Sequence, residues 1–452
     1  MSRLGRLTFT RCAHSHSIFK QPQRYILSKA TAFKDNEERI LKIPEPQLDI
    51  NRYCDPTLTE YFATNIKNRK GVGNIQRVIE LKNLLEGGRN ELLRRELIQE
   101  ALKIPNDTHP IPFSGGNDTK VVKYIGNRPE YQFQLQPFDK IMEYSSQYRM
   151  RELTPMAGHR AYYLCRDLAD LEHALIRYVV QILIKKGFCL ISVPDILHHQ
   201  IIECCGMITR GNRSIVYRLD ADKHLASAAE GELCLSGTAE MALAGFLMNR
   251  KLPRIELPKR YVAVSRCYRA ETADVASERG LYRVHQFTKV EMFGASTPNQ
   301  SEDLLEEFRS IQEDIFSSFE LYLQVLDMPP HELGAPAYRK YDIEAWLPSR
   351  SVFGEVSSCS NCTDYQSRRL NIQCFSENPA LTEFAHTVNG TACAIPRLII
   401  AICETHQQED GSIRIPQVLR PFMGHRDKIK PSKELTRFQK RAKELLRRIN
   451  VD

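Results

Sequence analysis

The chain has 452 residues, 42% of them hydrophobic, which is enough to bury a core larger than that of one average domain. No apolar run approaches a length of about 18 residues, so we expect no membrane-spanning helix and no membrane partner. The formal net charge of +8 is concentrated at the ends: residues 1–34 hold seven Lys or Arg and no acid, and residues 428–452 hold nine against three. The body is therefore mildly acidic, and a basic surface over the whole protein is not expected.

Residues 1–34 are rich in Arg, Ser and Thr, contain no acid and have no continuous apolar stretch. This composition is typical of an organellar import peptide rather than of a secretory signal, and we predict the mitochondrial matrix as the destination. A basic tail without a targeting role is the alternative.

A short helical hairpin is predicted after an irregular stretch over residues 35–70. Apolar residues recur at helical spacing over Asn74–Glu86 and Asn90–Lys103, and Gly87-Gly88 between them favours a tight turn. At 1.5 Å rise per residue each helix spans about 20 Å. Pro105 ends the second helix and begins a linker rich in Pro and Gly. We assign residues 35–130 to an N-terminal domain that carries this arm.

Long helices and apolar strands follow over residues 131–427, which we assign to one large domain. The predicted helices are Leu168–Lys186, residues 302–325 and Ile395–Glu404, and the predicted strands are Phe188–Val193, Tyr341–Leu347, Phe353–Ser358 and Arg368–Phe375. Strands that are mostly adjacent in sequence and flanked by a few helices indicate an α+β fold with an antiparallel sheet.

Charged residues collect in the stretch Arg260–Gly294, whose pattern predicts two strands joined by a polar loop. The charges within or at the ends of these strands are Arg269, Glu271, Arg283, Lys289 and Glu291. Charge inside a sheet is costly unless it is paired. With Phe287, this surface suits a ligand that has phosphates, an ammonium group and a flat base; a solvated hairpin with alternating charges is the alternative.

Thirteen cysteines are scattered along the chain, and the one Cys-x-x-Cys pair, Cys359 to Cys362, has no second pair at zinc spacing. We interpret all thirteen as reduced thiols, most of them buried. No metal site is therefore assigned to them.

Three motifs carry a resemblance to a known family. They are residues 187–197, GFCLISVPDIL, which contain Pro194; residues 267–294, with Arg-x-Glu at Arg269 and Glu271; and residues 386–424, with Arg397. Together with Thr238-Ala239-Glu240 they resemble the motifs of class II aminoacyl-tRNA synthetases, and within that class the seryl-tRNA synthetases of the mitochondrial type. The resemblance covers roughly residues 130–425. It implies that residues 131–427 form a class II catalytic domain and that the first motif builds a dimer interface.

The resemblance also implies a site for ATP and Mg²⁺. Its ATP-binding residues are Arg269, Ala270, Glu271, Arg283, Val284, Phe287, Glu355, Val356, Ser357, Ser358 and Arg397. Arg269 and Arg397 are the implied catalytic residues, because a fixed guanidinium stabilises the negative charge that develops as a carboxylate attacks the α-phosphate. Glu355 and Ser358 are the implied Mg²⁺ ligands, since both offer hard oxygen donors. A strand arginine or glutamate held in a structural salt bridge is the alternative for each.

The implied amino-acid pocket consists of Thr238, Ala239, Glu240, Arg269, Glu291, Asn389 and Thr391. A pocket built to hydrogen-bond a hydroxyl rejects alanine strongly, because its polar groups would be left unpaired. Selectivity for serine therefore follows without an editing domain. Taken singly, a Thr or Asn in a loop is more often a cap or turn residue.

The C-terminal residues 428–452 predict a basic amphipathic helix over Ser432–Asn450. Its cations, Lys440, Arg441, Lys443, Arg447 and Arg448, surround an apolar stripe and are candidates for contacts with tRNA phosphates. A solvated terminal helix and, less favoured, a helix on a membrane surface are the alternatives.

The leading hypothesis is ATP-dependent activation of L-serine to seryl-adenylate and its transfer to mitochondrial tRNA(Ser) by a homodimer, or by a heterodimer with a paralogous subunit. The arm is short for a seryl enzyme, so a relative of this core that charges a carrier protein is one alternative. A non-catalytic paralogue that binds RNA or regulates a partner is another. It ranks low, because the charged pocket residues are all present.

Overall fold

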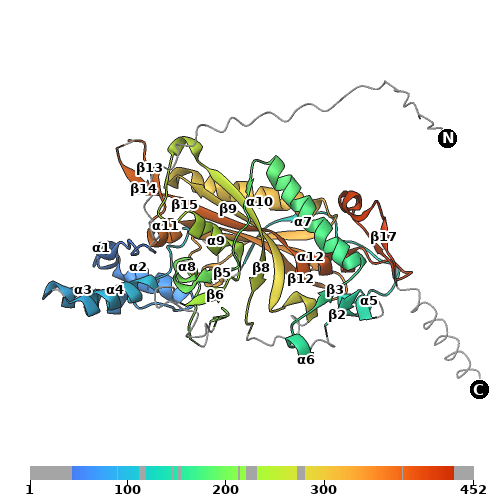
Figure 1. Cartoon of the computed structure of the whole chain (residues 1–452), viewed down its shortest axis with the longest axis horizontal. Helices are drawn as coiled ribbons and strands as arrows, with labels where there is room; N and C mark the ends of the chain where they lie inside the picture. The colour runs from blue at the N-terminus through green and yellow to red at the C-terminus, as the bar shows by residue number, and fades with distance from the viewer. Residues whose placement is uncertain are drawn as a thin grey trace, which may run out of the picture. The chain divides into compact units, whose positions relative to one another are not determined.

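The computed structural model describes residues 43–431, apart from residues 89, 111–118, 144–146, 151–153, 212–213, 220–231, 272–279 and 379. The expected import segment 1–34 and the basic helix 432–450 lie outside these residues. The predicted α+β architecture is confirmed, with an eight-stranded sheet flanked by helices (Figure 1). In the part of the chain that the structure describes, none of the helices is both long and apolar enough to traverse a bilayer.

The central sheet has the strand order β1-β10-β11-β12-β15-β9-β8-β4. Its strands are β1 (Lys120–Ile125), β4 (Cys189–Leu190), β8 (Lys259–Tyr268), β9 (Gln286–Ser296), β10 (Leu323–Asp327), β11 (Arg339–Leu347), β12 (Val352–Thr363) and β15 (His386–Ala394). Neighbouring strands are antiparallel except β4 and β8, which pair in parallel. The predicted antiparallel sheet is thus confirmed for all strands but β4, which makes the sheet mixed.

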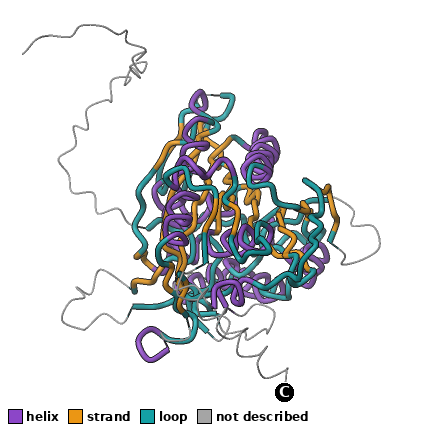
Figure 2. The backbone as a smooth tube through the Cα atoms, turned by 90° about the vertical axis from the view of Figure 1, so that its right-hand side faces the viewer, coloured by secondary structure: helices purple, strands orange, loops and turns teal. Residues whose placement is uncertain are grey.

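Both faces of β8 and β9 are buried. Val262 and Met292 pack in one core with helices α7 (Asp167–Lys185), α10 (Ser301–Ser317) and α12 (Ile395–Thr405). Ala263 and Phe293 pack in a second core with α8 (His199–Cys204), α9 (Ala239–Phe246) and α11 (Tyr365–Leu370). Successive side chains of a strand point to opposite faces, so helices cover the sheet on both sides (Figure 2).

The remaining elements of this part are short. The helices are α5 (Phe138–Glu143) and α6 (Thr154–Ala157), and the strands are β2 (Tyr148–Arg149), β3 (Tyr163–Leu164), β5 (Ile196–His198), β6 (Leu233–Leu235), β7 (Lys251–Leu252), β13 (Gln373–Phe375), β14 (Thr382–Phe384), β16 (Ile413–Arg414) and β17 (Lys428–Ile429).

Three predicted elements need correction. The stretch predicted as irregular contains helices α1 (Ile50–Tyr53) and α2 (Thr59–Asn68), and the helix predicted over 302–325 ends at Ser317. Leu321, Leu323 and Val325 are buried at every second position, which is the spacing of strand β10. The strand predicted over 368–375 begins as helix α11, which ends at Asn371 in the left-handed conformation.

The predicted hairpin is confirmed as helices α3 (Ile75–Glu86) and α4 (Glu91–Leu102). The side chains of Asn74 and Asn90 cap them by accepting backbone N–H bonds. Each helix has 12 residues, about 18 Å at 1.5 Å per residue. The hairpin shares an apolar core with α2, made of Phe62, Ile66, Ile75, Val78, Leu81, Leu97, Ala101 and Ile104.

Candidate active site

One cavity of about 1610 Å³ opens over β9, β11, β12 and β15. Its lining includes every residue predicted for ATP or serine except Ala239 and Ala270. Ala239 is buried in the first turn of α9, and Ala270 donates its backbone N–H to the Ile215 carbonyl. The cavity also reaches between α4 and α8. The fold therefore gathers side chains that lie far apart in sequence around one space.

Arg269 and Phe287 form one wall of the cavity. The Arg269 guanidinium lies 5.4 Å from the centroid of the Phe287 ring, and its Nη2 lies 3.5 Å from the Gly237 carbonyl oxygen. Its buried Nε has no hydrogen-bond partner among the described residues. A flat apolar ring beside a cation with spare donors suits a base and a phosphate.

The prediction that Glu271 lies within or at the end of a strand is wrong. β8 ends at Tyr268, and Glu271 lies in the following loop at φ +29°, a conformation that is sparsely populated for a residue with a Cβ. Two arginines hold it there: Arg283 Nη1 donates to Glu271 Oε2 at 2.7 Å, and Arg160 Nη1 donates to its backbone carbonyl at 2.7 Å. Side-chain contacts, rather than strand alternation, fix this carboxylate in the cavity wall.

Glu355 and Arg397 meet at the opposite side. Arg397 Nη1 donates to Glu355 Oε2 at 3.0 Å, and its guanidinium lies 4.6 Å from the centroid of the Tyr282 ring. Burial alone would raise the pKa of the Glu355 carboxyl, but Arg397 and Lys340 outweigh it and hold that pKa below its usual value. The carboxylate therefore remains ionised.

A β-bulge brings Glu355 and Ser358 to the same face of β12. Glu355 pairs with Glu344 and Ser357 pairs with Ile343, so Val356 is an extra residue on its strand. Residues three apart would otherwise point to opposite faces. Val356 itself is buried, and Ser357 turns away to donate to the Thr391 carbonyl at 2.6 Å. The two oxygen donors thus share the cavity with the Arg397 guanidinium, and they fit a hard divalent cation.

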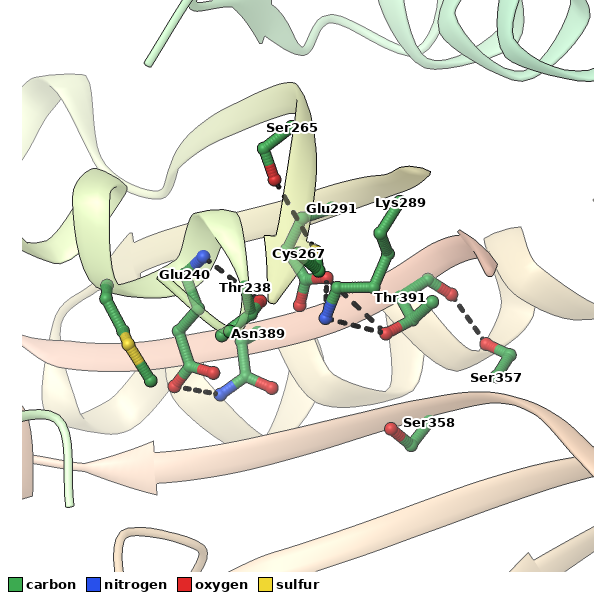
Figure 3. Close-up of polar contacts among 12 residues, drawn as sticks. Thr238, Glu240, Ser265, Cys267, Lys289, Glu291, Ser357, Ser358, Asn389 and Thr391 are labelled. Atoms are coloured by element: carbon green, nitrogen blue, oxygen red, sulfur yellow. Dashed lines mark hydrogen bonds and ion pairs between the residues drawn. The ribbon is translucent and has the colours of Figure 1, made fainter. Parts of the chain in front are cut away.

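A buried ion pair lies deeper in the cavity. Lys289 Nζ lies 2.5 Å from Glu291 Oε2, and Thr391 Oγ1 is 3.4 Å from each of these atoms (Figure 3). Lys289 and Glu291 are 6% and 2% exposed. A buried charge without its partner would be costly, so the pair fixes the Glu291 carboxylate in one orientation.

Glu240 and Asn389 form a second polar group beside this pair. Asn389 Nδ2 donates to Glu240 Oε1 at 2.8 Å (Figure 3), and Val284 also lines the cavity. Burial, and then the negative charge of Glu291, raise the pKa of Glu240 to about 7. Thr238 caps α9, because its Oγ1 accepts the Glu240 N–H at 3.3 Å. Its hydroxyl consequently points into the same corner.

Sequence reasoning assigned no site role to four residues that hold the predicted ones. They are Arg160 at Glu271, Tyr282 at Arg397, Lys289 at Glu291 and Gln366 at Glu240. The pairing of Lys289 with Glu291 could have been predicted from the sequence, since the two residues lie two apart on the same strand. Arg160 and Gln366 contact partners more than 100 residues away, and no local pattern signals them.

Comparisons with known proteins agree with this geometry. A family profile for the class II core domain of tRNA synthetases (G, H, P, S and T) matches residues 217–406. The chain is 46% identical over 335 residues to the mitochondrial serine–tRNA ligase of Mus musculus, a match over 74% of this chain but 63% of that protein. It is 39% identical over 359 residues to the serine–tRNA ligase of Rubrobacter xylanophilus, over 78% of this chain and 82% of that protein. A crystal structure of seryl-tRNA synthetase from Pyrococcus horikoshii complexed with ATP superposes with a TM-score of 0.69 at 30% identity, over 85% of this chain and 90% of that one.

Proposed function

This chain belongs to the seryl-tRNA synthetase family, and from that membership we propose that it activates L-serine with ATP and transfers the serine to mitochondrial tRNA(Ser). The observation that carries the proposal is the single cavity in which an arginine–aromatic wall, an arginine–carboxylate pair and a buried polar pocket meet. These three parts suit a base, a triphosphate and a small polar amino acid in turn. The chain spans less than two thirds of its mouse relative, so the proposal for activity rests on the site itself.

In the first step the serine carboxylate attacks the α-phosphorus of ATP, the bond to the bridging oxygen breaks, and pyrophosphate leaves. Negative charge develops on the α-phosphate oxygens, and Arg269, with its Nε and Nη donors beside Phe287, stabilises it. Phe287 stacks on the adenine, and Glu271 with the backbone at Val284 holds the edge of the base. Arg283 and Arg397 bind the outer phosphates.

Glu355 and Ser358 are the residues that would hold Mg²⁺, which would supply positive charge to the phosphates when bound. Arg397 donates to Glu355 Oε2 and so orients the carboxylate that would hold the ion. Val356 and Ser357 shape the bulge that gives both donors one direction.

The buried polar pocket binds the amino acid. Glu291 binds its ammonium group, while Glu240, Asn389, Thr391 and the Thr238–Ala239 helix start surround its side chain. Because buried polar groups would be left unpaired by alanine, the pocket selects a hydroxyl.

The remaining proposals concern the whole protein. Mitochondrial import through residues 1–34 is supported by their composition and by the mitochondrial relatives. Pairing through the motif around Pro194, as a homodimer or with a paralogous subunit, is supported by resemblance to the family's first motif. The tail cations from Lys440 to Arg448 are proposed to bind tRNA phosphates.

Serine-dependent exchange of pyrophosphate into ATP, followed by charging of mitochondrial tRNA, tests the activity with the purified chain. We expect both reactions. Absence of exchange with serine overturns the proposal, and exchange without charging of tRNA favours the carrier-protein alternative, for which the 12-residue arm helices are the supporting observation.

A further inference from the structure

Glu240 is held by a residue that does not reach the cavity. Gln366, in the first turn of α11, is fully buried and is not part of the cavity lining. Its Nε2 donates to Glu240 Oε1 at 2.6 Å, the shorter of the two amide contacts to that oxygen. Gln366 is therefore behind the pocket wall, with its amide directed at the carboxylate in front.

The orientation of the Gln366 amide is fixed in turn by β15. Thr387 Oγ1 donates to Gln366 Oε1 at 2.8 Å, which leaves the Nε2 end of the amide toward Glu240. Thr387 and Asn389 are two residues apart on β15 and share a face, so this strand supplies both the second donor to Glu240 and the anchor of the first. Gln366 and Thr387 are 0% exposed, and their hydrogen bonds are therefore shielded from water.

This arrangement leaves the two oxygens of Glu240 unequal. Oε1 accepts from Gln366 and from Asn389, whereas Oε2 accepts no hydrogen bond from any residue that the structure describes. Glu240 lines the cavity, so Oε2 is the acceptor that a bound amino acid meets.

We propose that Gln366 is a positioning residue for amino-acid selection: together with Thr387 it occupies Oε1 of Glu240, so that Oε2 of this carboxylate accepts a hydrogen bond from the serine hydroxyl. This role rests on the proposed function and deepens it. Gln366 touches neither substrate, and its effect passes wholly through the Glu240 carboxylate. Losing Gln366 therefore weakens serine binding specifically and leaves ATP binding intact.

The charge of Glu240 also depends on Gln366. The groups that act on this carboxyl are Glu291 and Lys289 on β9, Arg269 after β8, and the thiols of Cys205, directly after α8, and Cys362 on β12. Burial and Glu291 raise its pKa, while Lys289, the hydrogen bond from Gln366 and Arg269 lower it. Removing the Gln366 donor therefore raises the pKa further, and the ionised form requires a higher pH.

Gln366→Met keeps the side-chain length and removes both polar atoms. We expect the KM for serine in the exchange assay to rise about tenfold or more at pH 7, the effect of losing one charge-assisted hydrogen bond, while the KM for ATP changes less than about twofold. The pH midpoint of kcat/KM for serine should move upward, so that the defect shrinks at pH 9. Thr387→Val should shift both quantities in the same direction by a smaller amount.

Gln407→Met is the matched control, since Gln407 is also a buried glutamine with several hydrogen bonds but lies away from the cavity. It should alter thermal stability without changing the serine KM or the pH midpoint. If Gln366→Met does not fold, Thr387→Val carries the test, since it removes the anchor of the Gln366 amide. The smaller serine-specific, pH-dependent loss is then expected, and a folded Thr387→Val variant with the serine KM and pH midpoint of the wild type overturns the positioning role.

A folded Gln366 variant with the serine KM and pH midpoint of the wild type overturns the positioning role, and so does an equal loss for serine and ATP. Absence of serine-dependent exchange in the wild type is a different failure, because it overturns the proposed activity itself.

Discussion

The chemistry of this site depends on a few side chains whose surroundings set their charge. Arg269 and Glu291 are held in place by a ring and by a lysine, and Glu355 stays ionised beside Arg397. Burying these charged groups removes water from them, which costs free energy. That cost is offset only when a substrate supplies further partners for the charges. Substitutions at these positions should therefore act on catalysis more than on stability.

Replacing Arg269 with alanine should lower serine-dependent exchange by a factor of about 10² to 10³ or more, since it removes the donor at the α-phosphate. Arg260→Ala is the matched control on the same region: Arg260 lies on β8, pairs with Glu307 at 2.7 Å, and does not line the cavity. The control should retain exchange. Equal rates in the wild type and Arg269→Ala would refute the catalytic role.

Glu240→Gln should make the folded chain less sensitive to pH. The pKa of Glu240 is raised from 4.5 to about 7 in the folded chain. The unfolded chain therefore ionises this carboxyl more readily, and the folded state loses stability as the pH rises from about 4.5 to about 7. The variant, neutral at every pH, should melt at a higher temperature than the wild type at pH 8, and the difference should shrink toward pH 5. The variant should activate serine only weakly at both pH values. A melting difference that does not change with pH would contradict the assigned environment.

At the scale of elements, three structural features shape the region of the site. They are a β-bulge at Val356, a loop that holds Glu271 at positive φ, and the anchoring of the N-terminal helices. Buried Arg69 forms this anchor, because it donates to the carbonyls of Asn106, Gly334 and Ala335 and so joins α2 to the catalytic part. Burial lowers the pKa of its guanidinium to about 10.

Arg69→Ala should destabilise the junction by about 2 to 4 kcal/mol, because it strands several buried carbonyls. Hydrogen exchange of the α2–α4 peptides should accelerate while that of the central sheet changes little. Arg95→Ala is the control, since Arg95 is 70% exposed and pairs only with Glu91. An exposed ion pair of this kind contributes little to the free energy of unfolding. Unaltered protection of α2–α4 in Arg69→Ala would contradict the anchoring role.

The long helices and strands could be predicted from sequence, whereas the β-bulge in β12 and the loop position of Glu271 could not. Helices α3, α4, α7 and α12 follow from apolar periodicity and caps, and β8 and β9 from alternation. The cavity lining followed from motif resemblance. In contrast, the bulge at Val356 depends on pairing with β11, and the loop position of Glu271 depends on Arg160 and Arg283. Contacts between distant segments have no signature within a sequence window.

At the scale of the whole molecule, the proposed tRNA recognition draws on residues other than those of the proposed adenylation site. The arm helices α3 and α4 carry several cations, but Arg77, Lys82, Arg94, Arg95 and Lys103 are each paired with a glutamate. A surface neutralised in this way attracts phosphates weakly. The basic C-terminal residues, which lie outside the described part, are the stronger candidate for electrostatic contact.

Truncation after Lys430 should therefore spare serine-dependent exchange and weaken charging of tRNA. The charging defect should be largest at low salt, because the lost lysines and arginines contribute by counterion release. Charging measured against salt concentration in both chains tests this. Equal charging and equal salt dependence would exclude a role for the tail.

The most direct test of the account is the selectivity of pyrophosphate exchange across serine, alanine, threonine and glycine, measured as kcat/KM at pH 8. A pocket in which Glu240, Glu291 and Thr391 read a hydroxyl and an ammonium group predicts exchange with serine and a preference over alanine of about 10⁴ or more. Exchange with alanine within tenfold of serine, or no exchange with serine, would contradict it.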